Sequence, residues 1–339
     1  MLIDSGLLPS DLASVAERAR ALEAMGYDGL WTAEAGHDPY LACAIAATST
    51  ERLSIGTNIA VAFPRSPLVH AQIAWDLQAA SRGRFVLGLG TQVKGHNERR
   101  YSTAWGAPGP RLREMIQLIR HIWDVWQNGT KPGFDGEHYR FSLMTPFFSP
   151  GPIEWPAIPI YIAGVKPYMC RLAGELCDGL QVHPFHSVDY VERVVRPNVA
   201  AGLARSGRPG GAVTLATSAF VIMGKDAGEI ATARELARQQ LSFYASTRTY
   251  RVVLETHGWG DVADELSGRA ARGDWQGMAS LITDEMLAVY AIEGTYDEVP
   301  ALVRRKYQGL IDRVSFYALP TLERTDPAAW RRLMDACRA

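Results

Sequence analysis

The sequence predicts an α/β fold of the (β/α)8 TIM-barrel class, with an inserted helical segment before the last strand–helix unit. Short apolar runs typical of strands alternate with segments whose apolar residues recur at helical spacing, and this alternation indicates a parallel sheet. About eight such units can be counted, and eight favour a closed barrel over an open doubly wound sheet. The 339 residues are 47% hydrophobic and 21% charged, an ordinary composition for one globular domain spanning 1–339.

The first half of the chain supplies four of these units. The first helix is expected to run from a cap at Ser10 to Gly26, a residue type that commonly ends helices. An apolar stripe from Leu112 to Trp126 predicts the fourth helix and places Trp123 and Trp126 in the core. The expected strands are Met1–Ser5, Leu30–Thr32, Leu53–Val61 and Arg84–Gly90, and the second and third helices are Pro39–Thr50 and Ser66–Ser81.

The second half continues the alternation around one long helical block. The stretch FDGEHYRFS is expected to form a hairpin, and residues 227–290 read as mostly helical with breaks near Gly258 and Gly273, so they form the insertion. The expected strands are Ile158–Ala163, Gly179–Val182, Thr214–Met223 and Arg313–Leu319, and the expected helices are Pro167–Leu176, Val188–Ser206, Tyr296–Gln308 and Pro327–Cys337.

Bulk properties exclude several classes of function. The net charge is −1 and no basic face is evident, so nucleic acid is not expected as a partner. No apolar run approaches the roughly 20 residues of a spanning helix and no basic, then apolar, leader opens the chain, so we expect a cytoplasmic protein without a membrane partner. The four cysteines match no zinc spacing, so we expect them to act as buried small hydrophobes and expect no metal site.

Polar residues stand at the expected carboxyl ends of the strands, where a (β/α)8 barrel carries its functional face. They are Glu34, Asn58, Thr91, Gln92 and His183, in an otherwise apolar bowl. A mostly apolar lining with a few polar anchors suits a flat aromatic ligand.

The fourth strand ends in Gly88-Leu89-Gly90, which could also start a dinucleotide-binding fingerprint. That fingerprint needs a third glycine, and the third position here is Val93, a bulky, branched residue. We therefore expect Gly88 and Gly90 to let a ligand or another strand approach the backbone closely.

Several blocks in a fixed order carry a resemblance to a known family. They are ERLSIGTNIAVAFPRSPLVHAQIAWDLQAASRGRFVLGLGTQ, RLREMIQLIRHIWD, FDGEHYRF, IPIYIAG and AGELCDGLQVHPF. Through them nearly the whole chain resembles the luciferase-like monooxygenase superfamily of flavin and deazaflavin enzymes. The segments TAEAGHDPY and LMTPFFSPGP resemble its branch that uses coenzyme F420.

Three functions follow from this resemblance. The first is an F420-dependent oxidoreductase that moves a hydride between C5 of the deazaflavin and a small organic substrate. The alternatives are a monooxygenase that uses reduced FMN and a non-catalytic flavin-binding protein. Relatives of the last kind have lost part of the barrel, whereas this chain keeps about eight units, which favours an enzyme. Relatives are commonly dimers, so the resemblance also implies a homodimer.

The resemblance implies which residues hold the cofactor ring. In relatives a non-proline cis peptide bond ends the third strand and supports the ring from behind, and the matching bond here is Asn58–Ile59. The residues alone would predict a plain strand end. The ring-binding residues implied are Asn58, Ile59, Ala60, Gly90, Thr91 and Gln92.

The resemblance also places the cofactor's tail. In relatives its phosphate lies on backbone N–H groups after the fifth strand, just before a helix whose dipole favours an anion. Val165 stands where relatives commonly have glycine, and a simple strand-to-helix turn is the alternative. His183 is expected to touch the tail. The matching residues after the fifth strand are Ala163, Gly164, Val165 and Lys166.

The catalytic candidates are Glu34, His37 and Gln92. Relatives that oxidise an alcohol end the second strand in an acid and a histidine; Glu34 matches the acid, but Ala35 replaces the histidine. His37 is either a substitute suited to proton transfer or a turn residue bonded to backbone. Gln92 cannot donate a proton, so we expect it to hydrogen-bond ring or substrate. Residues 96–98 either contact a ligand or form a solvated loop. The missing histidine favours reduction of an electron-poor double bond or carbonyl.

Overall fold

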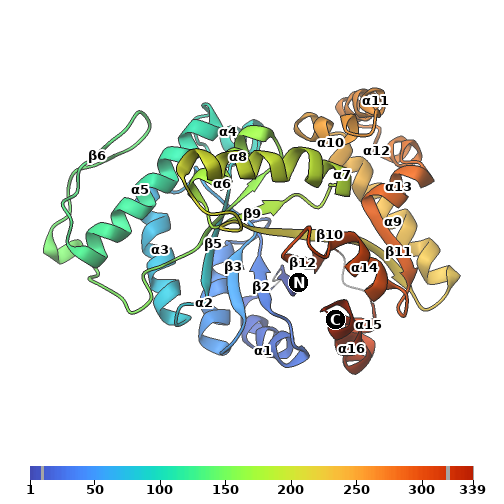
Figure 1. Ribbon diagram of the computed structural model, residues 1–339, viewed down its shortest axis with the longest axis horizontal. Helices are drawn as coiled ribbons and strands as arrows, with labels where there is room; N and C mark the ends of the chain where they lie inside the picture. Colours follow the sequence, from blue (N-terminus) through green and yellow to red (C-terminus); the bar gives the residue numbers. More distant parts are fainter. Residues whose placement is uncertain (9–10, 318–320, 339) are drawn as a thin grey trace.

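The computed structural model describes residues 1–8, 11–317 and 321–338 (Figure 1). Within this part of the chain, eight parallel strands close into the predicted barrel, and β12 closes the ring by pairing with both β1 and β10. In order around the ring the strands are β1 (Leu2–Leu7), β2 (Gly29–Thr32), β3 (Ser54–Thr57), β5 (Phe85–Gly90), β8 (Ile160–Gly164), β9 (Gly179–Val182), β10 (Thr214–Gly224) and β12 (Arg313–Phe316).

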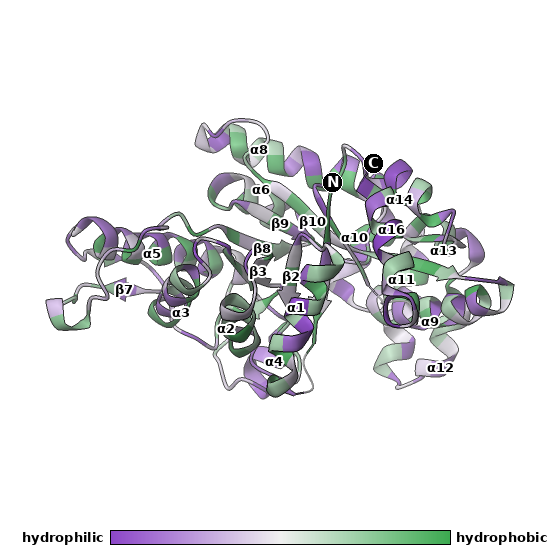
Figure 2. Ribbon diagram, turned by 90° about the horizontal axis from the view of Figure 1, so that it is seen from below, coloured by the Kyte–Doolittle hydropathy of each residue, from purple (hydrophilic) through white to green (hydrophobic). Residues whose placement is uncertain are grey.

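Helices surround the barrel, and several of them carry both hydrophobic and hydrophilic residues (Figure 2). The helices that connect barrel strands are α1 (Val15–Met25), α2 (Pro39–Ser49), α3 (Pro67–Ala80), α4 (Lys94–Arg99), α5 (Pro108–Asn128), α6 (Pro167–Leu176), α7 (Val188–Tyr190), α8 (Arg196–Ser206) and α14 (Val299–Tyr307). After the last barrel strand come α15 (Thr321–Thr325) and α16 (Pro327–Arg338). Of the described helices, none is long and apolar enough to cross a bilayer.

Residues 227–290 form the expected helical insertion, which projects on one side of the barrel (Figure 1). It contains α9 (Ala227–Ala245), α10 (Arg251–Glu255), α11 (Gly260–Ala271), α12 (Trp275–Met278) and α13 (Asp284–Tyr290). At the opposite end of the molecule, β6 (Phe134–Asp135) and β7 (Arg140–Phe141) make the predicted hairpin. The four cysteines, Trp123 and Trp126 are buried, as expected.

Several boundaries differ from the expectations. The third strand is split into β3 and β4 (Ala60–Val61). A further strand, β11 (Ala291–Thr295), pairs with the outer end of β10; it follows α13 directly, so no turn residues announce it. The expected cap Ser10 and the last two residues of the expected strand Arg313–Leu319 lie outside the described residues, and Asp11 caps the first turn.

The amino-terminal half of the barrel is filled by side chains. Asp4 and Arg313 form a buried ion pair with two contacts of 2.8 Å, and the indole N–H of Trp31 donates to Asp4 at 2.8 Å. Trp31 packs with Val86 and Tyr161 at the centre. A Cβ on Gly56 would lie 2.4 Å from the Trp31 ring, so only glycine leaves it room. Ligands must therefore lie at the carboxyl ends of the strands.

Candidate active site

The split in the third strand marks the centre of the site, because the bond between Asn58 and Ile59 is cis, as the resemblance implies. Both residues are held through backbone atoms: Asn58 N donates to the Thr32 carbonyl at 2.6 Å, and Glu34 N donates to the Ile59 carbonyl at 3.1 Å. A Cβ on Gly90 would lie 2.6 Å from the Ile59 side chain, so this glycine lets Ile59 pack over the end of β5.

Gly88 has a different partner. A Cβ there would lie 1.7 Å from the Thr57 carbonyl oxygen, and the Thr57 hydroxyl bonds both the N–H and the carbonyl of Gly88. The expectation that these two glycines permit a close approach is therefore confirmed, and the approaching groups belong to the third strand and the residues that follow it.

Glu34 is the centre of a partly buried polar network. Its carboxylate accepts hydrogen bonds from Val61 N at 2.7 Å, from both terminal nitrogens of Arg65 at 2.8 and 3.1 Å, and from the Tyr101 hydroxyl at 3.1 Å. Arg65 also pairs with Asp38 at 2.6 Å. Burial by itself would lower the pKa of Arg65, but its two carboxylate partners outweigh burial and raise the pKa above its ordinary value. Glu34 thus fixes the backbone next to the cis bond.

A second buried group lies behind this network. His70 Nε2 is 2.9 Å from the Ala62 carbonyl, to which it donates, so Nδ1 accepts from the Tyr40 hydroxyl at 2.7 Å. Burial lowers the pKa of His70 to about 4, so the ring is neutral at pH 7. Together with the Glu34 network, this pair holds residues 58–65 from both sides.

The mouth of the barrel offers open space and unpartnered acceptors. Gly6 lies two residues beyond Asp4 on the inner face of β1, and a Cβ there would meet no atom within 4 Å. The buried amide of Gln181 donates to the Thr57 carbonyl at 3.1 Å, while its Oε1 has no partner among the described residues. Asn97 is buried in α4 and its Oδ1 is likewise unpartnered. Space, an apolar floor and two free carbonyl-type oxygens suit a planar ring with N–H groups.

The predicted residues after β5 lie beside this space. Thr91 and Gln92 are half-buried, and Gln92 has a positive φ of 56° and accepts from Val93 N with its own side chain. Residues 96–98 form part of the helix α4 instead of a loop: His96 and Glu98 are exposed to solvent, whereas Asn97 is buried and donates to the Thr91 and Val93 carbonyls.

His37 lies at the rim. It is exposed in the bend between β2 and α2, and its ring has no hydrogen bond within the described part of the chain. Its neighbour Asp38 caps α2 and pairs with Arg65. The alternative of a turn histidine bonded to backbone therefore receives no support, and the imidazole is free to meet a ligand.

The expected phosphate segment forms the turn into α6. Lys166 is exposed at the N-cap of α6 and makes no side-chain capping bond, so the start of the helix is open to an anion. Gly164 is close-packed, since a Cβ would lie 2.7 Å from Met169 Cβ. The Tyr190 hydroxyl donates to the Val165 carbonyl, which fixes the turn.

His183 directly follows β9 and packs against aromatic residues of the insertion. Its ring lies 4.6 Å from the ring of Tyr244 and 4.1 Å from that of Tyr250. Its Nδ1 accepts from Phe185 N, and burial, followed by the nearby His186, lowers its pKa to about 3. His183 is therefore a neutral wall of the mouth next to the insertion.

Buried neutral histidines make stability depend on pH. Burial also lowers the pKa of His186 to about 4, so His70 and His186 stay unprotonated in the folded protein well below pH 6.5, where the unfolded chain binds protons. The contribution of these two histidines to the free energy of unfolding is complete above about pH 6.5. It falls as the pH drops toward 4, and at pH 5 the loss is about 2 kcal/mol per histidine. Urea unfolding at pH 7.5 and 5 measures this loss.

Two histidine variants test the assignment. His70→Asn should reduce the pH dependence, whereas His37→Asn, which changes an exposed ring, should leave it as in the parent protein. An unfolding midpoint that is constant from pH 7.5 to 5 would contradict the prediction.

The closed barrel and the cis bond after its third strand agree with the arrangement that the sequence resemblance implies. Comparison with known proteins shows to which family the chain belongs. The model for the luciferase-like monooxygenase family matches residues 3–313, so the chain belongs to this family. An uncharacterized protein of Mycobacterium tuberculosis is 46% identical over 309 residues, 91% of each chain. The 5,10-methylenetetrahydromethanopterin reductase of Archaeoglobus fulgidus is 31% identical over 284 residues, 82% of this chain and 81% of that one.

A solved structure shares the fold. The coenzyme F420-dependent tetrahydromethanopterin reductase of Methanopyrus kandleri superposes with a TM-score of 0.78 at 20% identity, over 99% of this chain and 96% of that one.

Sequence reasoning missed three polar residues of the site: Arg65, Tyr101 and Gln181. Gln181 had a visible signal, because it alternates with Gly179 and His183 on a short apolar strand and so faces the barrel interior. Tyr101 had none, since its partner Glu34 lies 67 residues away in the sequence.

Proposed function

We propose that this protein is an oxidoreductase that binds coenzyme F420 in the barrel mouth and moves a hydride between the cofactor and a small organic substrate. The observation that carries the proposal is the open space at Gly6 on the inner face of the barrel, in a chain 31% identical over 284 residues to an archaeal reductase. The fold shared with an F420-dependent reductase supports the same choice of cofactor.

The residues present fit a deazaflavin. When bound, the cofactor supplies a carbon centre, C5, that accepts or donates a hydride. Ile59 and Ala60 would support one face of the ring, and the unpartnered oxygens of Gln181 and Asn97 would accept from ring N–H groups or from bound water. The turn at 163–166 with Lys166 would hold the phosphate of the tail.

The protein's own groups divide the remaining tasks. Glu34 has both oxygens engaged, so we assign it to positioning the cis segment rather than to proton transfer. His37 is exposed at the rim and has no hydrogen bond within the described chain, so we assign it the proton transfer of the proposed reaction. Gln92 bonds substrate or ring as a neutral amide. The expected homodimer and cytoplasmic location stay predictions.

Cofactor titration tests the proposal. Adding F420 and FMN separately to the purified protein, with ligand fluorescence as the readout, should show micromolar binding of F420 and weaker binding of FMN. Reduced F420 should then transfer its hydride to 2-cyclohexen-1-one, measured as the return of absorbance at the F420 band. Tight FMN binding without an F420 response would instead favour the monooxygenase.

A further inference from the structure

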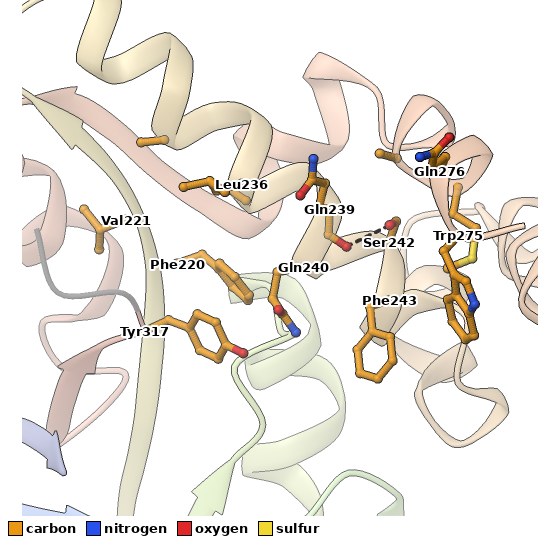
Figure 3. A pocket seen from close by; sticks show the side chains of 14 residues that line it. Phe220, Val221, Leu236, Gln239, Gln240, Ser242, Phe243, Trp275, Gln276 and Tyr317 are labelled. Atoms are coloured by element: carbon orange, nitrogen blue, oxygen red, sulfur yellow. Dashed lines mark hydrogen bonds between the residues drawn. The ribbon is translucent and has the colours of Figure 1, made fainter. Parts of the chain in front are cut away.

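A cavity lies between the end of the barrel and the insertion, apart from the residues assigned above. Its volume is about 960 Å³, within the range of small-molecule sites. Phe220 of β10 and Tyr317, which follows β12, lie on one side, and Phe243 of α9 and Trp275 of α12 lie on the other, with Gln240 between them (Figure 3).

The lining of this cavity carries no charge among the described residues. Apolar and aromatic side chains dominate, and the polar groups are neutral glutamine and serine side chains. An anionic ligand would lose its hydration here without gaining a cation, which is costly, whereas an uncharged apolar body would bury surface favourably. The chemistry of the lining thus selects an uncharged molecule with few polar atoms.

Large apolar side chains of the cavity are left open to solvent. Leu236 is 63% exposed, Trp275 55% and Phe243 49%. A bound aromatic or alicyclic molecule would cover these groups, and the glutamine amides could bond a carbonyl oxygen on it.

The cavity shares a wall with the mouth of the barrel. Phe220 stacks on Tyr317 with ring centroids 4.4 Å apart, and the hydroxyls of Tyr317 and Tyr244 are 2.5 Å apart. Tyr244 in turn contacts His183 at the end of β9. A molecule held in the cavity therefore lies one layer of rings away from the space assigned to the cofactor.

We propose that this cavity binds an uncharged, carbonyl-containing aromatic or alicyclic molecule, at a site separate from the space assigned to the cofactor. The binding can be tested without F420. The same uncharged lining disfavours phosphorylated and carboxylated molecules.

Calorimetric titration of the whole protein with menadione, an uncharged naphthoquinone, and with glucose 6-phosphate tests the proposal. Menadione should bind with micromolar affinity and glucose 6-phosphate should give no heat. Leu236→Arg places a charge at the cavity edge on an exposed helix position, so menadione affinity should fall by about tenfold or more. Leu143→Arg, at an exposed leucine outside the cavity, should bind menadione like the parent protein.

The outcomes separate this proposal from the previous one. If Leu236→Arg loses menadione binding and Leu143→Arg keeps it, the cavity is supported as the menadione site. This conclusion holds even if F420 does not bind and the proposed reaction fails. Unchanged menadione affinity in Leu236→Arg, no menadione binding at all, or tighter binding of glucose 6-phosphate would overturn it. A shift of oligomeric state caused by Leu236→Arg in size-exclusion chromatography would also overturn it, by showing that a second copy covers these side chains.

Discussion

Replacing Glu34 by leucine is expected to destabilise the protein by about 1–3 kcal/mol, because it leaves partly buried hydrogen-bond donors without their acceptor. The change leaves Val61 N and the Tyr101 hydroxyl without their acceptor and Arg65 with Asp38 alone. Urea unfolding at pH 7.5 measures the loss. F420 affinity should fall as well, because Glu34 holds the segment that follows the cis bond.

His37→Ala is the matched control, three residues along the same loop. Its side chain is exposed and unbonded within the described chain, so the unfolding midpoint and F420 affinity should be those of the parent. Turnover with reduced F420 and 2-cyclohexen-1-one should fall, because the proposed proton carrier is gone. If Glu34→Leu is as stable as the parent, the hydrogen bonds of Glu34 do not position the segment at 58–65. If His37→Ala turns over at the normal rate, His37 is not a catalytic residue.

Gly6→Leu should abolish F420 binding while the protein stays folded. A Cβ at this position would meet no atom within 4 Å, so we expect the leucine side chain to extend into the open mouth instead of the core. We expect the free energy of unfolding to stay within about 0.5 kcal/mol of that of the parent, the usual range for a surface substitution. Fluorescence titration with F420 measures the loss of affinity.

Gly88→Ala is the contrasting variant. Its Cβ would lie 1.7 Å from the Thr57 carbonyl oxygen, so this smaller change should lower stability by forcing the third strand to move. If Gly6→Leu binds F420 as tightly as the parent protein, the ring does not occupy the space above β1, and the proposed placement is wrong.

The barrel could be predicted from the sequence because each strand–helix unit is a local pattern. Apolar runs such as Phe85–Gly90 and stripes such as Leu112–Trp126 depend on neighbours a few residues away. β11 was not predicted, because a strand that follows a helix without a turn gives no local signal.

The candidate site could be predicted only in part. Their positions at the ends of expected strands identified Glu34 and Gln92 as candidate site residues. The cis bond was predicted from the family resemblance, because no residue type in the sequence indicates it. The role of Glu34 could not be read, because its partners Arg65 and Tyr101 lie 31 and 67 residues away and only the closed fold brings them together. The insertion's contact with His183 is hidden for the same reason.

The ion pair of Asp4 and Arg313, topped by Trp31, seals one end of the barrel. No ligand can therefore reach the ring of strands from the amino-terminal side. Any molecule that binds inside the barrel has to enter and leave on the side where the strands end.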